Sequence, residues 1–231
     1  MGYLYDVYRA TERRNKERIL ELAPRIPGAR LLDLGCNDGA FTVELARQVS
    51  AGETHGVEFV DELAAVARAR GIDVIGGDLN EPLPYASESF DVVHSNQVIE
   101  HVVKTDVFAR EIRRVLKPSG YALVSTNNLA SWHNVFSLLL GFQPTPCHVS
   151  DEYVVGNRLD PRRGERHPER GATHLRIFAF EGLRELLELH GLRVDVLATA
   201  GYYPLPPRIA DVCCRIDPRH GAFLIARATP V

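Results

Sequence analysis

Ten residues near the N-terminus, Leu31 to Ala40 (LLDLGCNDGA), restrict the fold more than any other part of the 231-residue chain. Arg30 to Leu34 is a short apolar run, and Phe41, Leu45 and Val49 follow at the spacing of one helical face. This pattern predicts a strand, a tight turn that contains glycine, and a helix. Small residues in such a turn let the backbone approach a ligand closely, and the first turn of the helix has unpaired N–H groups.

The same alternation of strand and helix continues along the chain. Further strands are predicted at 54–59, 72–75, 90–94 and 121–125, and helices at 61–70 and 106–116. We expect Asp106 to cap the second of these helices, and Lys117 to Gly120 to end it. The predicted buried faces are Leu63, Val66 and Ala67 in the first helix and Phe108, Ile112, Val115 and Leu116 in the second. Alternating strands and helices predict an α/β fold, doubly wound, with a parallel sheet between two helical layers.

The two ends of the chain differ from this core. Residues 4–22 read as a polar helical arm, and 132–140 as an apolar helix. Residues 141–172 are rich in Pro, Arg, Gly and His without periodicity, which is typical of a lid, a binding loop or disorder. A helix at 180–190 and closing strands at 192–198 and 222–228 follow, with a Pro-rich segment and a short helix between these strands. We therefore expect one domain: an arm (1–28), a core (29–128), a lid (129–172) and a C-terminal part of the sheet (173–231).

Composition narrows the class of protein. Hydrophobic residues make up 45% of the chain and charged residues 25%, as in a globular domain with a real core. The formal net charge of −3 gives no broad positive field, so we expect no nucleic-acid partner. The chain has no apolar run of 18 residues and no signal-peptide core within residues 1–18, so we expect no membrane span and a cytoplasmic location. The cysteines lack zinc spacing and should be reduced thiols; they are Cys36, Cys147, Cys213 and Cys214.

The segment from Leu31 to Ala40 resembles motif I of class I S-adenosylmethionine-dependent methyltransferases. The order of later segments agrees over residues 30–128 with the small-molecule branch of that superfamily, the methyltransferase type 11/12-like group. These segments are Glu58 after the second strand, Gly77-Asp78-Leu79 after the third, Phe90 to Asn96 with Glu100-His101-Val102 behind it, and Leu116 to Tyr121. A weaker resemblance, His174 to Phe178, extends toward the C-terminus. Asn37 departs from the pattern, because many members have glycine there, but asparagine tolerates left-handed backbone.

The resemblance implies a Rossmann-like sheet of seven strands in the order 3-2-1-4-5-7-6, with strand 7 antiparallel. It also implies S-adenosyl-L-methionine as the cofactor and S-adenosyl-L-homocysteine as its product. In this family an acid at the position of Glu58 accepts the ribose hydroxyls, and one at the position of Asp78 accepts the adenine amino group. The predicted cofactor-binding residues are Asp33, Gly35, Cys36, Asn37, Gly39, Glu58, Phe59, Asp78, Leu79 and Asn96. Singly, each acid has a plainer alternative: a cap or loop bond for Asp33, a solvated strand end for Glu58, and a turn for Asp78.

The implied reaction is methyl transfer to an oxygen or nitrogen atom of a small molecule, such as a natural-product or glycan intermediate. Such a methyl transfer is accelerated mainly by alignment of the acceptor atom with the methyl group and by exclusion of water. An acceptor that holds a proton also needs a base. Histidines near the expected mouth of the site are His101, His133, His148 and His174, of which His101 and His133 are the predicted catalytic residues. His101 could instead start a helix, and His133 could cap or pack the helix at 132–140.

Acceptor binding is predicted for Asn128, His174, Arg176 and Tyr202. Arg176 suits a carboxylate or phosphate, although it could equally be a surface strut that pins the lid, and Tyr202 could simply pack. No metal is expected, because the positions after strands four and five carry the neutral side chains Ser95, Asn96, Asn127 and Asn128. The chain is expected to be a monomer or homodimer. Two rival functions remain: a nicotinamide-dependent oxidoreductase, for which no Tyr-x-x-x-Lys pair follows strand four or five, and a noncatalytic S-adenosylmethionine-binding module.

Overall fold

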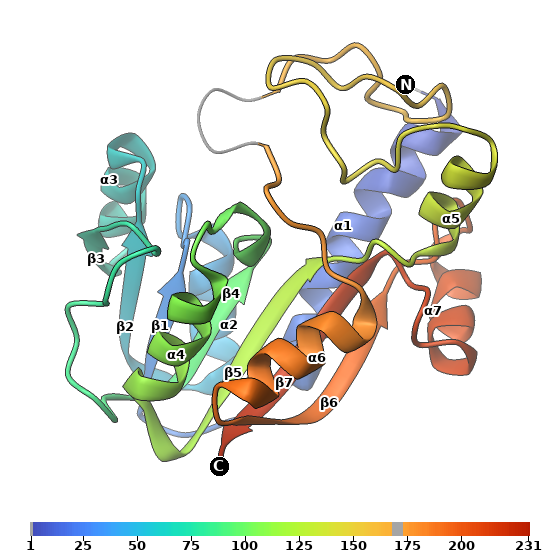
Figure 1. Cartoon of the computed structure of the whole chain (residues 1–231). Coiled ribbons are helices and arrows are strands. Elements are labelled where there is room, and N and C mark those ends of the chain that lie inside the picture. Colours follow the sequence, from blue (N-terminus) through green and yellow to red (C-terminus); the bar gives the residue numbers. More distant parts are fainter. Residues whose placement is uncertain (1, 168–172) are drawn as a thin grey trace.

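A computed structural model describes residues 2–167 and 173–231 of the chain (Figure 1). The described strands form one seven-stranded sheet in the order β3-β2-β1-β4-β5-β7-β6, in which β7 runs antiparallel to both β5 and β6. The strands are β1 (Ala29–Leu34), β2 (Ala51–Glu58), β3 (Asp73–Gly76), β4 (Phe90–Asn96), β5 (Leu116–Asn127), β6 (Leu192–Ala200) and β7 (Phe223–Pro230). The strand order and the antiparallel seventh strand implied by the resemblance are confirmed.

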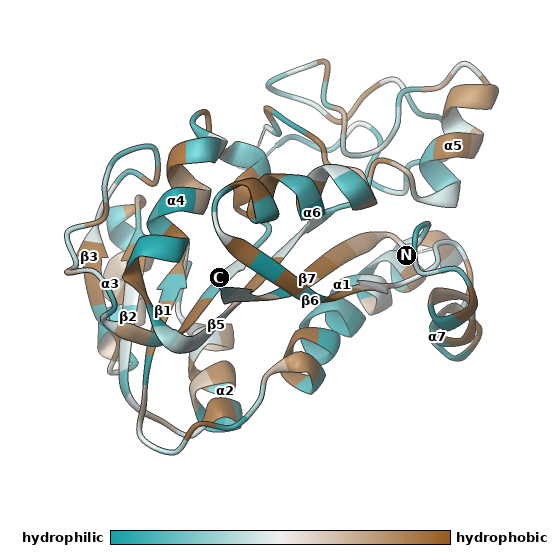
Figure 2. Cartoon of the chain, turned by 60° about the horizontal axis from the view of Figure 1, so that its bottom comes forward, coloured by the Kyte–Doolittle hydropathy of each residue, from teal (hydrophilic) through white to brown (hydrophobic). Residues whose placement is uncertain are grey.

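Helices cover both faces of this sheet. They are α1 (Tyr3–Leu22), α2 (Ala40–Val49), α3 (Asp61–Ala69), α4 (Thr105–Val115), α5 (Trp132–Leu139), α6 (Phe180–Leu189) and α7 (Pro207–Ile216), and a 3₁₀ turn spans Ile99–His101. On one face, Phe108 of α4 and Leu183 of α6 are buried against the sheet. On the other face, Ile19 of α1 and Leu45 of α2 are buried against the sheet, and α3 packs beside α2. Figure 2 shows the corresponding division, with hydrophilic residues on the outer side of α4 and apolar residues along the strands.

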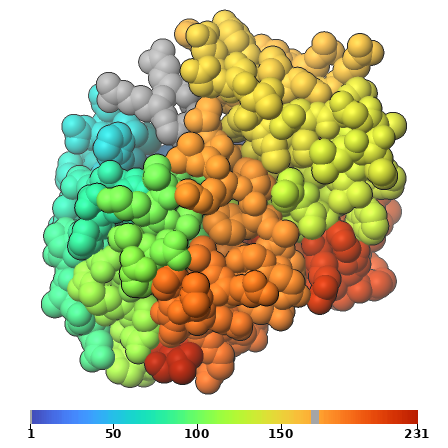
Figure 3. Space-filling view, viewed as in Figure 1, coloured from blue at the N-terminus to red at the C-terminus, as the bar shows by residue number. Residues whose placement is uncertain are grey.

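The predicted lid lies across the edge of the sheet at which the parallel strands end (Figure 1). Beyond α5, its described residues form no further helix or named strand up to residue 167; residues 168–172 of the predicted lid lie outside the described part of the chain. In the space-filling view this segment, coloured mostly yellow, lies above the orange surface that includes α6 (Figure 3). Among the described residues, none of the helices is both long and apolar enough to cross a membrane.

Three local predictions were wrong. Leu116, predicted on the buried face of the helix at 106–116, begins β5 instead, because α4 ends at Val115. Asp106 does not cap α4: it lies inside the first turn and pairs with His190 at 2.8 Å, and no side chain caps the helix at Lys104. In α3 the buried residues are Ala64 and Ala67, whereas Val66 is 43% exposed. The small alanine side chains let this short helix sit close to the sheet, so its buried face is narrower than the apolar pattern suggested.

Candidate active site

The turn between β1 and α2 is built from three residues with left-handed backbone. Gly35, Asn37 and Gly39 have φ angles of 76°, 52° and 77°. A Cβ atom at Gly35 would lie 2.5 Å from a methyl carbon of Val98, so the turn has no room for a side chain there. Asn37 adopts the left-handed conformation, as the sequence predicted for the position where many relatives have glycine.

Glu58, at the end of β2, holds this turn in place. Its Oε2 accepts the backbone N–H of Asn37 at 2.8 Å, and its Oε1 accepts that of Val60 at 2.9 Å. The residue is only 8% exposed, so it is not a solvated strand end. Each carboxylate oxygen has two lone pairs, and one on each remains for a ligand hydroxyl.

Asp33, at the end of β1, is also buried. Its Oδ2 accepts the hydroxyl of Thr42 at 2.5 Å, and its Oδ1 lies 2.7 Å from Nδ1 of His94. Asp33 therefore neither caps α2 nor bonds the loop backbone; it joins β1 to α2 and β4 through side chains. Because Nδ1 of His94 faces a carboxylate, it carries a proton, and the opposite ring nitrogen, Nε2, is buried with no partner among the described residues.

Asp78 follows β3 and forms a turn. Its Oδ1 accepts both the backbone N–H and the side-chain amide of Asn80, at 2.9 and 2.7 Å. This is the turn role that the sequence left open for Asp78, and it is compatible with ligand binding, since Oδ2 has no partner among the described residues.

These strand ends enclose a cleft of about 810 Å³ at the edge of the sheet. Of the ten residues predicted to bind the cofactor, nine line it: Asp33, Gly35, Cys36, Asn37, Glu58, Phe59, Asp78, Leu79 and Asn96. Gly39 does not, because it faces Ile72 and Ala67 beneath the first turn of α2. Burial raises the pKa of the Cys36 thiol to about 12, so Cys36 contributes a neutral side chain to the wall.

A second cavity of about 640 Å³ adjoins the cleft beneath the lid. The two share five lining residues: Glu12, Lys16, Asn96, Gln97 and His101. The remainder of the second cavity is formed by α1, by the lid, and by Asn127, His174 and Phe223. A molecule in it would therefore lie directly beside a molecule in the cleft.

His101 lies at the junction of the two cavities. Its Nδ1 is 3.1 Å from the carbonyl oxygen of Thr173, which can only accept, so Nδ1 carries the proton of the neutral ring and Nε2 is left as an acceptor. Burial lowers the pKa of His101, which favours this neutral form. The alternative that the sequence left open, a residue that starts a helix, does not hold: His101 ends a 3₁₀ turn, and α4 begins at Thr105.

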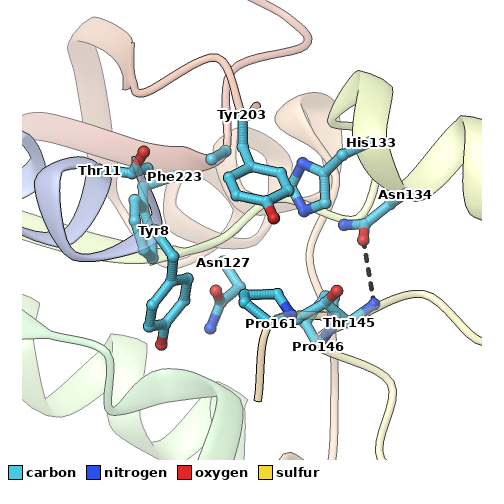
Figure 4. A pocket seen from close by; sticks show the side chains of 11 residues that line it. Tyr8, Thr11, Asn127, His133, Asn134, Thr145, Pro146, Pro161, Tyr203 and Phe223 are labelled. Atoms are coloured by element: carbon cyan, nitrogen blue, oxygen red, sulfur yellow. Dashed lines mark hydrogen bonds between the residues drawn. The ribbon is translucent and has the colours of Figure 1, made fainter. Parts of the chain in front are cut away.

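His133, the other predicted catalytic residue, lines neither of these cavities. It borders a smaller cavity of about 50 Å³, where its ring lies 5.3 Å from that of Tyr203 (Figure 4). This cavity shares five lining residues with the second cavity: Tyr8, Asn127, Thr145, Pro146 and Phe223. Burial lowers its pKa to about 4. The structure therefore does not bring His133 to the cleft, and its position agrees with the packing role left open for it.

Of the four predicted acceptor-binding residues, one lines the second cavity and three line neither cavity. His174 lines the second cavity and holds the carbonyl oxygen of Pro146 at 2.8 Å through Nδ1. Asn128 is fully buried with its amide donating to Arg219 and Gly221, and Tyr202 donates to Asp217 at 2.6 Å. These two residues and Arg176 line neither cavity.

Arg176 donates to the carbonyl oxygen of Val102 at 3.0 Å, which is the strut that the sequence offered as an alternative. The same segment is tied down twice more, because the backbone N–H groups of Leu175 and Arg176 both donate to the carbonyl oxygen of Glu100.

One group of side chains has the spacing of a metal site. Ligand atoms of Glu100, His101 and His174 lie within 4.8 Å of one another. Both carboxylate oxygens of Glu100 are already bonded, to Thr126 at 2.8 Å and Asn127 at 3.1 Å. Both histidines use Nδ1 for a backbone carbonyl. Only their Nε2 atoms therefore keep a free lone pair that could bind a metal.

Several residues of the second cavity were not singled out by the sequence. They are Tyr8, Arg9, Glu12, Arg13, Asn15 and Lys16 of α1, and Arg162 and His167 of the lid. A signal did exist for the arm: Thr11 and Asn15 continue the four-residue spacing of Val7 and Ile19, so polar residues stand in the buried stripe of the helix. Polar side chains in such a stripe need partners, which Asn15 finds in Asn96 at 2.8 Å and Ser125 at 3.0 Å.

Comparison with known proteins agrees with this geometry. The sequence profile of a family described as "Methyltransferase domain" matches residues 32–124, the part of the chain that supplies most of the cleft. A malonyl-[acyl-carrier protein] O-methyltransferase of Herminiimonas arsenicoxydans is 32% identical over 133 residues, 58% of this chain and 50% of the relative. A probable S-adenosylmethionine-dependent methyltransferase of Mycolicibacterium smegmatis is 38% identical over 118 residues, 50% of this chain and 45% of the relative. The matches thus span about half the length of these curated relatives.

Likeness in three dimensions extends over nearly the whole chain. The crystal structure of an S-adenosylmethionine-dependent methyltransferase from Mesorhizobium loti superposes with a TM-score of 0.63 at 19% identity, covering 92% of this chain and 96% of that one. At this identity the likeness concerns the fold alone.

Proposed function

We propose that the chain is a class I S-adenosylmethionine-dependent methyltransferase, which transfers a methyl group from S-adenosylmethionine to a small-molecule acceptor; the family profile, the relatives and the shared fold support this. One observation carries the proposal: three neighbouring strand ends place the glycine turn, Glu58 and Asp78 around a single cleft. Open α/β sheets bind their ligands at this edge. The acceptor atom is proposed to be oxygen or nitrogen, in a natural-product or glycan intermediate.

The residues of the cleft fit an adenosyl ligand. Glu58 offers buried acceptor oxygens to the two ribose hydroxyls, and Asp78 offers an acceptor to the adenine amino group. Phe59 is 69% exposed yet lines the cleft, so a flat ring can cover it. Buried Nε2 atoms of His94 and Gln97 face no partner among the described residues, which supports a polar ligand in this cleft.

When bound, S-adenosylmethionine supplies a methyl group on a positively charged sulfur. The task of the chain is to align the acceptor with that methyl group and to exclude water. Asn96 and Gln97 stand at the junction of the two cavities, where such alignment is needed. The neutral ring of His101 can accept, at Nε2, the proton that an oxygen or nitrogen acceptor releases.

We propose that no metal takes part. The grouping of Glu100, His101 and His174 supports this, because it offers a single carboxylate, which already accepts hydrogen bonds from Thr126 and Asn127, and two imidazole nitrogens. Catalytic zinc ordinarily has three protein ligands, and magnesium prefers carboxylates. Dialysis against a strong chelator should therefore leave turnover unchanged, and loss of turnover that zinc or magnesium restores would contradict the proposal.

Calorimetric titration with S-adenosylhomocysteine tests the cofactor assignment. Asp78→Ala removes an acceptor for the adenine amino group and should weaken binding about tenfold or more, the usual effect of losing a hydrogen bond to a charged group. Asp73→Ala is the matched control, because Asp73 begins β3 at the opposite edge of the sheet and carries the same charge. Equal affinity of wild type and Asp78→Ala would show that the adenine assignment is wrong.

The two rival functions predict different results with the wild-type chain. A nicotinamide-dependent oxidoreductase would bind NADH and not S-adenosylhomocysteine. A noncatalytic module would bind S-adenosylhomocysteine but would produce none from S-adenosylmethionine with any of a panel of hydroxyl and amine acceptors.

A further inference from the structure

The second cavity is strongly cationic. Among the described residues that line it, four carry a positive charge (Arg9, Arg13, Lys16 and Arg162) and one, Glu12, carries a negative charge. Glu12 is already committed, because it pairs with Arg9 at 2.9 Å and accepts the hydroxyl of Tyr8 at 2.9 Å. This excess is local, since the chain as a whole has a formal net charge of −3.

Arg162 is the cation that best marks a binding site. It comes from the lid, and its guanidinium lies 5.1 Å from the centre of the Tyr8 ring of α1. No described residue accepts a hydrogen bond from this guanidinium or forms an ion pair with it, and its Nε is buried. Asp160, two residues away, accepts the backbone N–H of Arg162 but forms no ion pair with its side chain.

Unpartnered polar groups gather at this same end of the cavity. His148 and His167 line it with ring centres 4.4 Å apart, and Nε2 of each is buried without a partner within the described ranges. His167 is only 8% exposed. The backbone N–H of His174 points to Nδ1 of His148 at 3.4 Å, so in the neutral ring Nε2 of His148 carries a proton and is a donor.

Buried donors without acceptors are costly, and an unpaired arginine fork matches a planar or tetrahedral anion. We propose that the acceptor of the methyl group carries a carboxylate or phosphate, which binds Arg162 at the lid end of the second cavity. The opposite end of the same cavity meets the cofactor cleft at Asn96 and His101, so the anion anchors the acceptor while its reacting atom lies at the junction. This inference rests on the proposed function, because it assigns the second cavity to the acceptor.

The test measures binding of three small probes to the full chain saturated with S-adenosylhomocysteine. Benzoate and phenyl phosphate carry the two candidate anions, and benzamide is the uncharged counterpart of benzoate. Wild type should bind at least one anion about tenfold more tightly than benzamide. Arg162→Gln should abolish that preference while leaving the affinity for benzamide and for S-adenosylhomocysteine within about twofold.

Arg163→Gln is the matched control, because Arg163 has the same charge in the same loop but is exposed and lines neither cavity. It should keep the preference for the anion. The inference is overturned if wild type binds benzamide as well as the anions, if no anion binds at millimolar concentrations, or if both variants weaken anion binding equally. Failure of wild type to bind S-adenosylhomocysteine would instead contradict the proposed function, and repeating the probe titrations without it keeps the two results separate.

Discussion

Glu100 is a carboxyl group that the fold buries completely beside the candidate active site. Its side chain is 0% exposed and is bonded by the hydroxyl of Thr126 and the amide of Asn127. Burial is the largest influence on its ionisation and raises the pKa of Glu100 from 4.5 to about 7. Near neutral pH this group therefore retains a proton that it would lose in the unfolded chain.

This difference makes the stability of the protein depend on pH. Between about pH 4.5 and 7 the native state holds the proton and the unfolded state does not, so the free energy of unfolding falls as pH rises. Glu100→Gln keeps the shape and cannot ionise. Relative to wild type, its free energy of unfolding should rise by about 2.5 kcal/mol between pH 5 and pH 8. Urea unfolding of both proteins at both pH values measures this change.

Glu165→Gln is the control for that comparison, because Glu165 is exposed and undergoes the same change of charge. Its difference from wild type should be nearly independent of pH. An equal difference between Glu100→Gln and wild type at pH 5 and pH 8 would show that Glu100 ionises as it does in the unfolded chain.

Gly39 shows how closely α2 packs against its neighbours. A Cβ atom there would lie 2.5 Å from Ile72 and 3.0 Å from Ala67, in addition to the strain of a φ angle of 77°. Gly71 has a similar φ angle of 87° but open space where its Cβ would be. Gly39→Ala should therefore cost about 1–3 kcal/mol more of unfolding free energy than Gly71→Ala. Equal costs in denaturant unfolding would mean that backbone strain alone explains the glycine.

At the scale of elements, a buried polar side chain of α1 forms hydrogen bonds to two strands, in addition to the apolar packing of the helix. Asn15 is 3% exposed and bridges Asn96 of β4 and Ser125 of β5. Asn96 also lines the cofactor cleft, so this bridge connects the arm with the candidate active site.

Asn15→Leu keeps the size of the side chain but leaves both partners unsatisfied. It should lower the free energy of unfolding by about 1–3 kcal/mol and weaken binding of S-adenosylhomocysteine, because Asn96 loses the bond that orients it. Arg18→Ala on the same helix is the control, since its ion pair with Glu21 is partly exposed and should contribute less than about 1 kcal/mol. Unchanged affinity of Asn15→Leu for S-adenosylhomocysteine would show that the bond between Asn15 and Asn96 does not contribute to cofactor binding.

The elements also show what the sequence could and could not predict. Periodicity located the helices and strands of the described chain, because that pattern reflects which face each element buries. It located the start of α4 to within one residue but not the contact that precedes it, in which the side chain of Asn80 accepts the N–H groups of Val103 and Lys104 from more than twenty residues away. The turn after β1 is local and was predictable, whereas the pairing of Arg162 with Tyr8 depends on how a lid without periodicity folds over α1.

For the whole molecule, the two cavities divide the structure into parts that depend on a ligand and parts that do not. The cleft and the second cavity are lined mainly by residues of α1, of the strand ends with the loops that follow them, and of the lid. These elements meet at one edge of the sheet (Figure 1). By contrast, α6 packs on the opposite face from α1 and contributes no residue to either cavity.

Hydrogen exchange with and without S-adenosylhomocysteine should reveal this division. A ligand that binds only the native state, present at about 100 times its Kd, raises the free energy of any opening that destroys its site by about 2.7 kcal/mol. Glu12 and Lys16 of α1 line the cleft, so openings that detach α1 from the sheet disrupt the cleft. Exchange of α1 amides should therefore slow when the ligand is added. Local openings of α6 leave the cleft intact, and amides that exchange through them should keep their rates. If α1 and α6 slowed equally, the ligand would act only through global unfolding, and if α1 did not slow at all, the arm would not be part of the site.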